Sequence, residues 1–226
     1  MQTKSTFIFT IALTLLLTSS ATGQWRIGVE AGPDINALRT NISNVSMTKY
    51  VPVVSYSVGV PLQYKLSPLL TFETDPSFVR KNYKLEWTGF LSGWYQTTKS
   101  NYAEIPLLVN FLFSSGRFHL ALQGGAFIAY WVTGKLKGTL PDPFGTNYNY
   151  DSPYVFRGAR DQRLDFGSQA GIRLLYDAGK AGQWFFGATD LISFIDRQKN
   201  YETGLIPQYN RTLIFSAGVL FKLSHQ

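Results

Sequence analysis

Residues 163–176 read Arg-Leu-Asp-Phe-Gly-Ser-Gln-Ala-Gly-Ile-Arg-Leu-Leu-Tyr, an alternation of two kinds of side chain. The odd positions from Arg163 to Arg173 are charged, polar or glycine, whereas the even positions, apart from Ser168, are apolar or aromatic. Because successive side chains of a β-strand point to opposite faces, this period of two predicts a strand with a different environment on each side. The rest of the chain repeats the pattern.

The composition favours a sheet that faces lipid. Of the 226 residues, 45% are hydrophobic and only 15% are charged, against about 25% charged in ordinary soluble domains. The chain has 13 Tyr, 17 Phe and no cysteine, which excludes a disulfide framework in an exported protein. The formal net charge of +7 comes from scattered Lys and Arg rather than a basic run. We therefore interpret it as lumen and rim charge and expect no nucleic-acid partner.

The first 23 residues have the features of a secretory signal peptide. Lys4 supplies a positive start, residues 7–17 are apolar, and the small residues Ala21 and Gly23 stand at positions −3 and −1 of the expected cleavage site. The apolar core is too short for a transmembrane helix of about 20 residues. We expect export, with residues 24–226 forming one barrel domain in the outer membrane of a Gram-negative bacterium.

Eight segments share the alternation of residues 163–176. Their predicted bounds are 25–36, 53–65, 69–87, 102–113, 118–132, 163–176, 184–196 and 210–223. The third segment loses its parity near Val79, Arg80 and Lys81, which predicts a bulge there or an exit from the membrane. The seventh alternates least cleanly, because Asp190 falls on the same parity as Trp184.

The connections between these segments alternate in length. The long ones are residues 37–52, 88–101, 133–162 and 197–209, and the short ones are 66–68, 114–117 and 177–183. An up-and-down transmembrane barrel has short periplasmic turns and long external loops. The fold class that we predict is therefore an all-β, eight-stranded antiparallel up-and-down transmembrane β-barrel.

The polar face of the strands should point into the barrel. Backbone groups in lipid must all be paired, so the sheet closes on itself, and at eight strands side chains fill the interior. Charges of both signs are available for a lumen polar network. Its predicted members are Arg26, Glu30, Glu73, Asp75, Glu104, His119, Gln123, Arg163, Asp165, Gln169 and Arg173.

Three segments resemble the PorT-like outer-membrane β-barrel family of Bacteroidetes. They are Gly28-Val29-Glu30-Ala31-Gly32, Tyr102-Ala103-Glu104-Ile105-Pro106-Leu107-Leu108, and the glycine-spaced residues 165–171. Glu73-Thr74-Asp75-Pro76 departs from the usual glutamate-proline run of the family. The resemblance implies an outer-membrane barrel. A few members of that family are linked to protein secretion and gliding, whereas most have no assigned activity, so the resemblance implies fold and location rather than mechanism.

The sequence offers few candidates for catalysis. His119 would act as a general base only with a serine and an acid in hydrogen-bond reach, and Glu73, Asp75 and Glu104 would form an acid/base pair only if they were not charge-paired. We favour packing roles for all four residues. Without cysteine or a histidine-rich motif, we expect no metal and no cofactor.

The longest predicted loop, residues 133–162, is the candidate for recognition. Its aromatic residues are Phe144, Tyr148, Tyr150 and Tyr154, a residue type common at protein and glycan interfaces. Besides outer-membrane lipid, we expect partners among envelope proteins or glycans.

The main hypothesis is a non-enzymatic barrel that presents long external loops, with a structural or adhesive role or a place in an envelope or secretion assembly. A lipid-modifying enzyme and a small pore stay open as alternatives. A soluble, lipocalin-like barrel would invert every predicted face.

Overall fold

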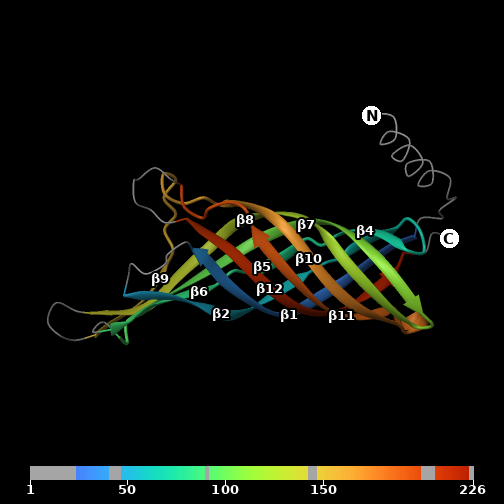
Figure 1. Ribbon diagram of the computed structural model, residues 1–226, viewed down its shortest axis with the longest axis horizontal. Coiled ribbons are helices and arrows are strands. Elements are labelled where there is room, and N and C mark those ends of the chain that lie inside the picture. Colours follow the sequence, from blue (N-terminus) through green and yellow to red (C-terminus); the bar gives the residue numbers. More distant parts are fainter. Residues whose placement is uncertain (1–23, 41–46, 90–91, 142–146, 200–206, 224–226) are drawn as a thin grey trace, which may run out of the picture.

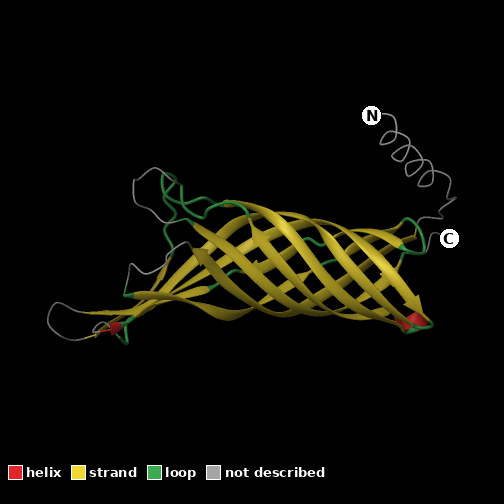
Figure 2. Ribbon diagram, viewed as in Figure 1, coloured by secondary structure: helices red, strands yellow, loops and turns green. Residues whose placement is uncertain are grey.

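The computed structural model describes residues 24–40, 47–89, 92–141, 147–199 and 207–223. The predicted signal peptide and Phe144 lie outside these ranges. The described chain is almost entirely β-sheet, rolled into a long barrel (Figures 1 and 2). Its strands are β1 (Gln24–Thr40), β2 (Thr48–Gly59), β3 (Leu62–Lys65), β4 (Leu70–Thr74), β5 (Ser77–Arg80), β6 (Tyr83–Trp87), β7 (Tyr95–Ser115), β8 (Phe118–Pro141), β9 (Asn147–Pro153), β10 (Leu164–Asp177), β11 (Gln183–Ser193) and β12 (Gln208–Lys222). A short 3₁₀ turn, Gly179–Ala181, lies between β10 and β11. In the described ranges, no helix is long and apolar enough to cross a membrane.

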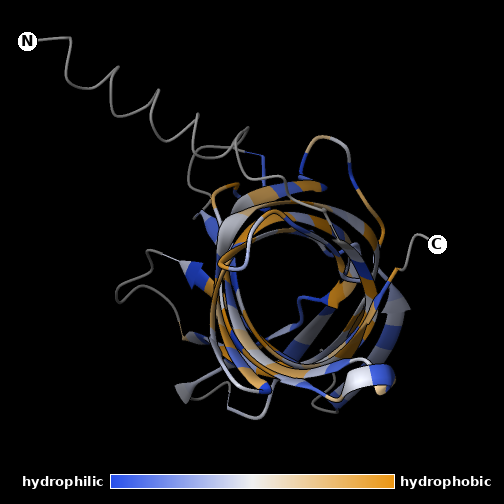
Figure 3. Cartoon of the chain, turned by 90° about the vertical axis from the view of Figure 1, so that its right-hand side faces the viewer, coloured by the Kyte–Doolittle hydropathy of each residue, from blue (hydrophilic) through white to orange (hydrophobic). Residues whose placement is uncertain are grey.

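The strands close into an antiparallel ring of eight wall positions. β2 and β3 share one position and β4, β5 and β6 share another, while β1, β7, β8, β10, β11 and β12 occupy one each. The pairing of β1 with β12 closes the ring, from Arg26 opposite Lys222 to Thr40 opposite Gln208. Figure 3 shows the closed ring viewed along its axis. The predicted eight-stranded up-and-down barrel is therefore confirmed.

Two wall positions are interrupted where prolines or irregular backbone stand. The chain breaks at Pro61 between β2 and β3, and at Pro76 between β4 and β5, as expected for a residue without an N–H for the ladder. Backbone bonds bridge the breaks, among them Gly28 N–H to Pro61 O at 2.8 Å and Val60 N–H to Pro76 O at 3.1 Å. The third break falls at residues 81–82, where the sequence predicted an irregularity.

The two faces of the sheet differ as the alternation predicted. Outward side chains are apolar and exposed, and inward ones are buried and largely polar. On β7, Leu107 is 70% exposed and its neighbour Leu108 only 2%. The lipocalin-like arrangement, with the apolar face inside, does not describe this chain.

The prediction of a loop at residues 133–162 is wrong for much of this range, which is β-strand. β8 continues to Pro141, and β9 pairs with it from Asn147 opposite Pro141 to Pro153 opposite Lys135. The prediction failed because β7 begins at Tyr95, before its predicted start at residue 102. The additional residues of β7 pair with the additional residues of β8. Residues 48–52, 83–87, 95–101, 133–141 and 147–153 together form a sheet beyond the barrel wall, the outer extension, seen at the left of Figure 1.

Asp190 interrupts the apolar pattern without interrupting the strand. It stays on the outward face of β11, where Arg211 of β12 donates to it from Nε at 3.1 Å and from Nη2 at 2.8 Å. Two opposite charges thus share one outward site as a bidentate pair, which explains how a carboxylate is tolerated on an apolar wall.

The assignment of faces predicts a difference between two neighbouring positions. Because the chain has no cysteine, Leu107→Cys and Leu108→Cys each give a single thiol for a fluorescent label. In bilayers that contain brominated lipid, we expect strong quenching of the label at position 107 and weak quenching at position 108. Equal quenching, or the reverse order, would contradict the assignment.

Candidate functional site

An arginine-centred cluster fills the lumen nearer the short-turn end of the barrel. Arg173 of β10 is 2% exposed. It donates from Nη2 to Glu30 Oε2 at 2.7 Å and from Nη1 to Glu73 Oε1 at 2.6 Å. Glu73 also accepts from Gln63 Nε2 at 2.7 Å and Asn110 Nδ2 at 2.8 Å. A buried charge requires such partners, because the desolvation of an unpaired ion is costly.

A lysine-centred cluster lies further toward the long-loop end. Lys81, at the break between β5 and β6, is fully buried, and its Nζ lies 3.0 Å from Glu104 Oε2 and 3.2 Å from Asp165 Oδ2. Ser193 Oγ donates to the same Asp165 oxygen at 2.9 Å. The ammonium also stands 4.6 Å from the centre of the Phe127 ring. The sequence pattern missed Lys81 because it lies where the parity of its strand is lost.

Little space separates the two clusters. A cavity of about 20 Å³ lies between them, lined by side chains that include Glu30, Asp75, Glu104 and Arg173, and this is room for about one water molecule. Gly59 makes room for Asp75, since a Cβ at position 59 would lie 2.5 Å from Asp75 Oδ1. The lumen carboxylates Glu30, Glu73, Glu104 and Asp165 therefore have cationic partners, whereas Asp75 makes no ion pair with a described residue. The cavity beside them leaves no space for a substrate.

Aromatic side chains close the lumen at the long-loop end. This outer cap consists of Tyr83, Tyr102, Trp131, Tyr154 and Phe156, with the guanidinium of Arg197 among them. Trp131 is 1% exposed, and its ring centre lies 4.7 Å from that of Tyr154 and 4.8 Å from that of Phe156. Arg197 stands 4.4 Å above the Trp131 ring. The sequence missed Arg197 because it lies at the start of a predicted long loop.

Asp161 folds the segment that follows β9 onto the outer cap. Its carboxylate accepts from Tyr154 Oη and Arg160 Nε, each at 2.8 Å, and from the Arg157 N–H at 2.7 Å. Burial alone would raise the pKa of Asp161, but the bonds from Arg160, the Arg157 N–H and Tyr154 offset it and hold the pKa below the ordinary 3.8. Burial, followed by the bond to Asp161, raises the pKa of Tyr154. This segment is thus an ordered part of the closure.

The four predicted recognition aromatics have different surroundings. Tyr148 is 62% exposed on β9. Tyr150 donates from Oη to Gln96 Oε1 at 2.9 Å, and Tyr154 packs in the outer cap. Phe144 lies outside the described residues. Of the described three, Tyr148 is the one available to a partner.

His119 lies apart from the lumen clusters, beside the short turn between β7 and β8. Its Nδ1 is 2.7 Å from Ser114 Oγ. Asp177 is near this end too, but its Oδ1 accepts from the Gly179 N–H at 2.9 Å. In the described ranges, no carboxylate is hydrogen-bonded to the imidazole. The structure brings a serine to His119, but no third group that would orient the ring for catalysis.

The other predicted lumen residues divide into two groups. Asp165, Gln123 and Gln169 are buried inside, and Arg26 donates from Nη1 to Gln183 Oε1 at 2.8 Å near the short-turn end. Arg163 does not belong to the lumen network. Its Nε donates to Trp131 O at 3.0 Å, and its guanidinium stacks 4.5 Å from the centre of the Tyr130 ring. The prediction for Arg163 was wrong because β10 begins one residue later, at Leu164.

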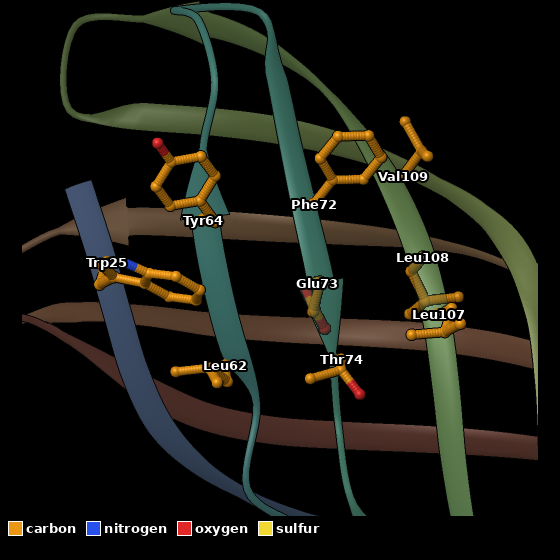
Figure 4. Close-up of a pocket in the computed structure, with 9 residues that line it drawn as sticks. All are labelled: Trp25, Leu62, Tyr64, Phe72, Glu73, Thr74, Leu107, Leu108 and Val109. Carbon is orange, nitrogen blue, oxygen red and sulfur yellow. The ribbon is translucent and has the colours of Figure 1, made fainter. Parts of the chain in front are cut away.

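In the described ranges, no group of three or more His, Asp or Glu side chains is arranged to hold a metal ion. One pocket is a groove of about 420 Å³ on the outer wall. Trp25 and Tyr64 line one side of it and Leu107 and Val109 the other (Figure 4). The groove is apolar and carries no arrangement for catalysis.

A family model described as an outer membrane protein beta-barrel domain matches residues 12–196. The chain belongs to this family. Membership places it in the outer membrane, with the exposed apolar wall in lipid and the paired charges in the lumen. The long-loop end is then the external end of an outer-membrane barrel.

Solved structures of outer-membrane proteins are similar to this chain at low sequence identity. The outer membrane protease OmpT from Escherichia coli is 7% identical with a TM-score of 0.52, and the match covers 91% of this chain and all of that one. Neisserial surface protein A is 11% identical with a TM-score of 0.47 and coverages of 90% and 100%. Ail of Yersinia pestis is 13% identical with a TM-score of 0.43 and coverages of 88% and 99%. No curated protein matches the chain.

The cluster around Arg173 predicts a large loss of stability when its cation is removed. Arg173→Gln leaves Glu30 and Glu73 buried without their common partner, and we expect the free energy of unfolding to fall by about 3–5 kcal/mol. The measurement is urea unfolding of the barrel in vesicles, followed by tryptophan fluorescence. Glu86→Gln, which removes the exposed pair with Lys84, is the control and should cost less than about 1 kcal/mol. Equal costs for the two variants would contradict the prediction.

The role of Asp161 predicts a pH-dependent outer cap. Because the folded-state pKa is lowered, the contribution of Asp161 is present at neutral pH and is lost as the pH falls through that pKa, below about 4. We expect Asp161→Asn to speed tryptic cleavage after Arg157 and Arg160 at neutral pH, measured by mass spectrometry over time. We also expect the melting temperatures of this variant and the wild type to converge at acid pH. Asp151→Asn, on exposed β9, should be cleaved at the wild-type rate, and a constant temperature difference would refute the account.

Proposed function

We propose that this chain is a non-enzymatic barrel of the PorT-like type, exported by its signal peptide, that presents the outer extension to partners in the cell envelope. The observation that carries the proposal is the contrast between the two parts of the molecule. The lumen is filled by paired charges and closed by the outer cap, while the outer extension continues the sheet beyond it. A partner can therefore contact side chains of the outer extension but cannot reach those of the lumen.

The partner that fits this surface is another envelope protein or a glycan, as in a structural, adhesive or secretion assembly. Tyr148 is the exposed aromatic of β9, and its neighbours Asn147 and Asn149 carry amide groups. Tyrosine with asparagine is a combination that supplies contact area and adaptable hydrogen bonds.

A photo-crosslinking residue at position 148 tests the proposal in living cells. We expect a discrete crosslinked species at position 148 and none at position 176, where Tyr176 faces outward beside the short turn. Mass spectrometry of the crosslinked species identifies the partner, and the band should disappear when the photo-crosslinking residue stands at position 148 in cells that lack this partner. Identical patterns at the two positions, or no product at position 148, would overturn the proposal.

The enzyme alternative rests on one observation, the contact between His119 and Ser114. The test is the lipid profile of cells that carry Ser114→Ala, His119→Ala or Glu104→Gln. We expect the wild-type profile in all three, because no carboxylate of the described residues is hydrogen-bonded to the imidazole. A profile altered alike by Ser114→Ala and His119→Ala would establish the alternative.

The pore alternative predicts steady conductance in planar bilayers. We expect the wild-type protein to be silent, because the outer cap and the two ion-pair clusters obstruct the lumen. Steady single-channel steps that persist in the purified, monodisperse protein would contradict this expectation.

A further inference from the structure

The outward face of the outer extension is basic. Register places five lysines on this face, one on β2, one on β6, one on β7 and two on β8. They are Lys49, Lys84, Lys99, Lys135 and Lys137. The same face carries two carboxylates, Glu86 and Asp151. We call this surface the lysine face.

Two of the lysines are direct cross-strand partners. Lys99 of β7 stands opposite Lys135 of β8, and Thr97, two residues from Lys99, stands opposite Lys137. Like charges directly opposite each other destabilise a sheet. Because this pair of lysines destabilises the sheet, its presence indicates a functional role for the positive charge.

The carboxylates on the face neutralise only part of it. Lys84 Nζ lies 2.7 Å from Glu86 Oε1, and Lys135 Nζ lies 2.9 Å from Asp151 Oδ1. Within the described ranges, Lys49, Lys99 and Lys137 have no carboxylate within 4.0 Å, and all three are exposed. The hydrogen bond from Lys135, together with the charges of Lys137 and Lys99, lowers the pKa of Asp151. The lysines thus create a positive electrostatic potential over the lysine face.

The lysine face continues the wall that faces lipid. On β7 the outward positions change from Leu107 and Ile105, both exposed, to Lys99. On β8 they change from Val132 to Lys135 in three residues, a rise of about 10 Å along the strand. A surface that begins where the apolar wall ends lies in the polar layer of the membrane, which is several ångströms thick.

We propose that the lysine face binds the phosphate groups of glycolipid headgroups in the outer leaflet. Ammonium groups form charge-assisted hydrogen bonds with phosphate oxygens, and basic clusters next to a membrane attract anionic headgroups. The ligand is a lipid rather than a soluble anion, because the lysine face continues the lipid-facing wall along β7 and β8. The inference rests on the proposed function only for its orientation, with the long-loop end outside.

Native mass spectrometry of the purified barrel in detergent tests the proposal, with diphosphorylated lipid A as the probe. We expect the triple variant Lys49→Gln, Lys99→Gln, Lys137→Gln to lose about 100-fold in affinity. The matched control replaces the lysines of the opposite end, Lys65, Lys180 and Lys222, with glutamine and should keep the wild-type affinity. Lipid A without phosphates should bind the wild type as weakly as it binds the triple variant.

Three results would overturn the proposal. They are unchanged affinity in the triple variant, equal binding of lipid A with and without phosphates, and full displacement of lipid A by a soluble sulfated glycan. Matching circular dichroism melts of all variants ensure that a loss of binding does not come from unfolding. A failure of crosslinking at Tyr148 with intact lipid A binding would refute the proposed function alone.

Discussion

The pairing of every backbone N–H and C=O group in lipid is the constraint on which this structure depends. A sheet in hydrocarbon has no water to satisfy a free edge, so β12 returns to β1 and the wall closes. Closure then fixes the side chains, because every second residue must point into a lumen too narrow for bulk water. The polar residues of the inward face have to find partners inside the lumen, and Arg173 and Lys81 supply cationic partners for Glu30, Glu73, Glu104 and Asp165.

The same constraint separates the two ends of the molecule. Inside lipid, a break in a strand must be bridged, as at Pro61 and Pro76, where neighbouring backbone groups supply the bonds. Beyond the wall, the strands need no ring, and β9 pairs with β8 alone. The outer extension can therefore be shaped for partners, whereas the barrel wall cannot. Membership in the outer-membrane barrel family fixes location and fold.

Much of the fold could be predicted from the sequence, because the two-residue alternation can be read along each strand by itself. The pairing of backbone groups in lipid then requires the strands to form a closed sheet. The inward positions of Glu30, Glu104 and Arg173 follow from parity alone. Lys81 could not be placed, because it stands at a break where parity is undefined. The length of β8 could not be predicted either, since residues 133–141 are strand only because β7 and β9 pair with them. The ion-pair partners depend on strand register around the ring, which alternation within one strand does not encode.

The gel mobility of the protein in the outer-membrane fraction, boiled against unboiled in SDS, tests the central claim most directly. A closed barrel with a paired backbone ladder and ion-pair clusters in its lumen resists SDS until it is heated, so the account predicts a mobility difference between the two samples. The same mobility in both, with the protein recovered in the soluble fraction, would contradict the closed transmembrane barrel.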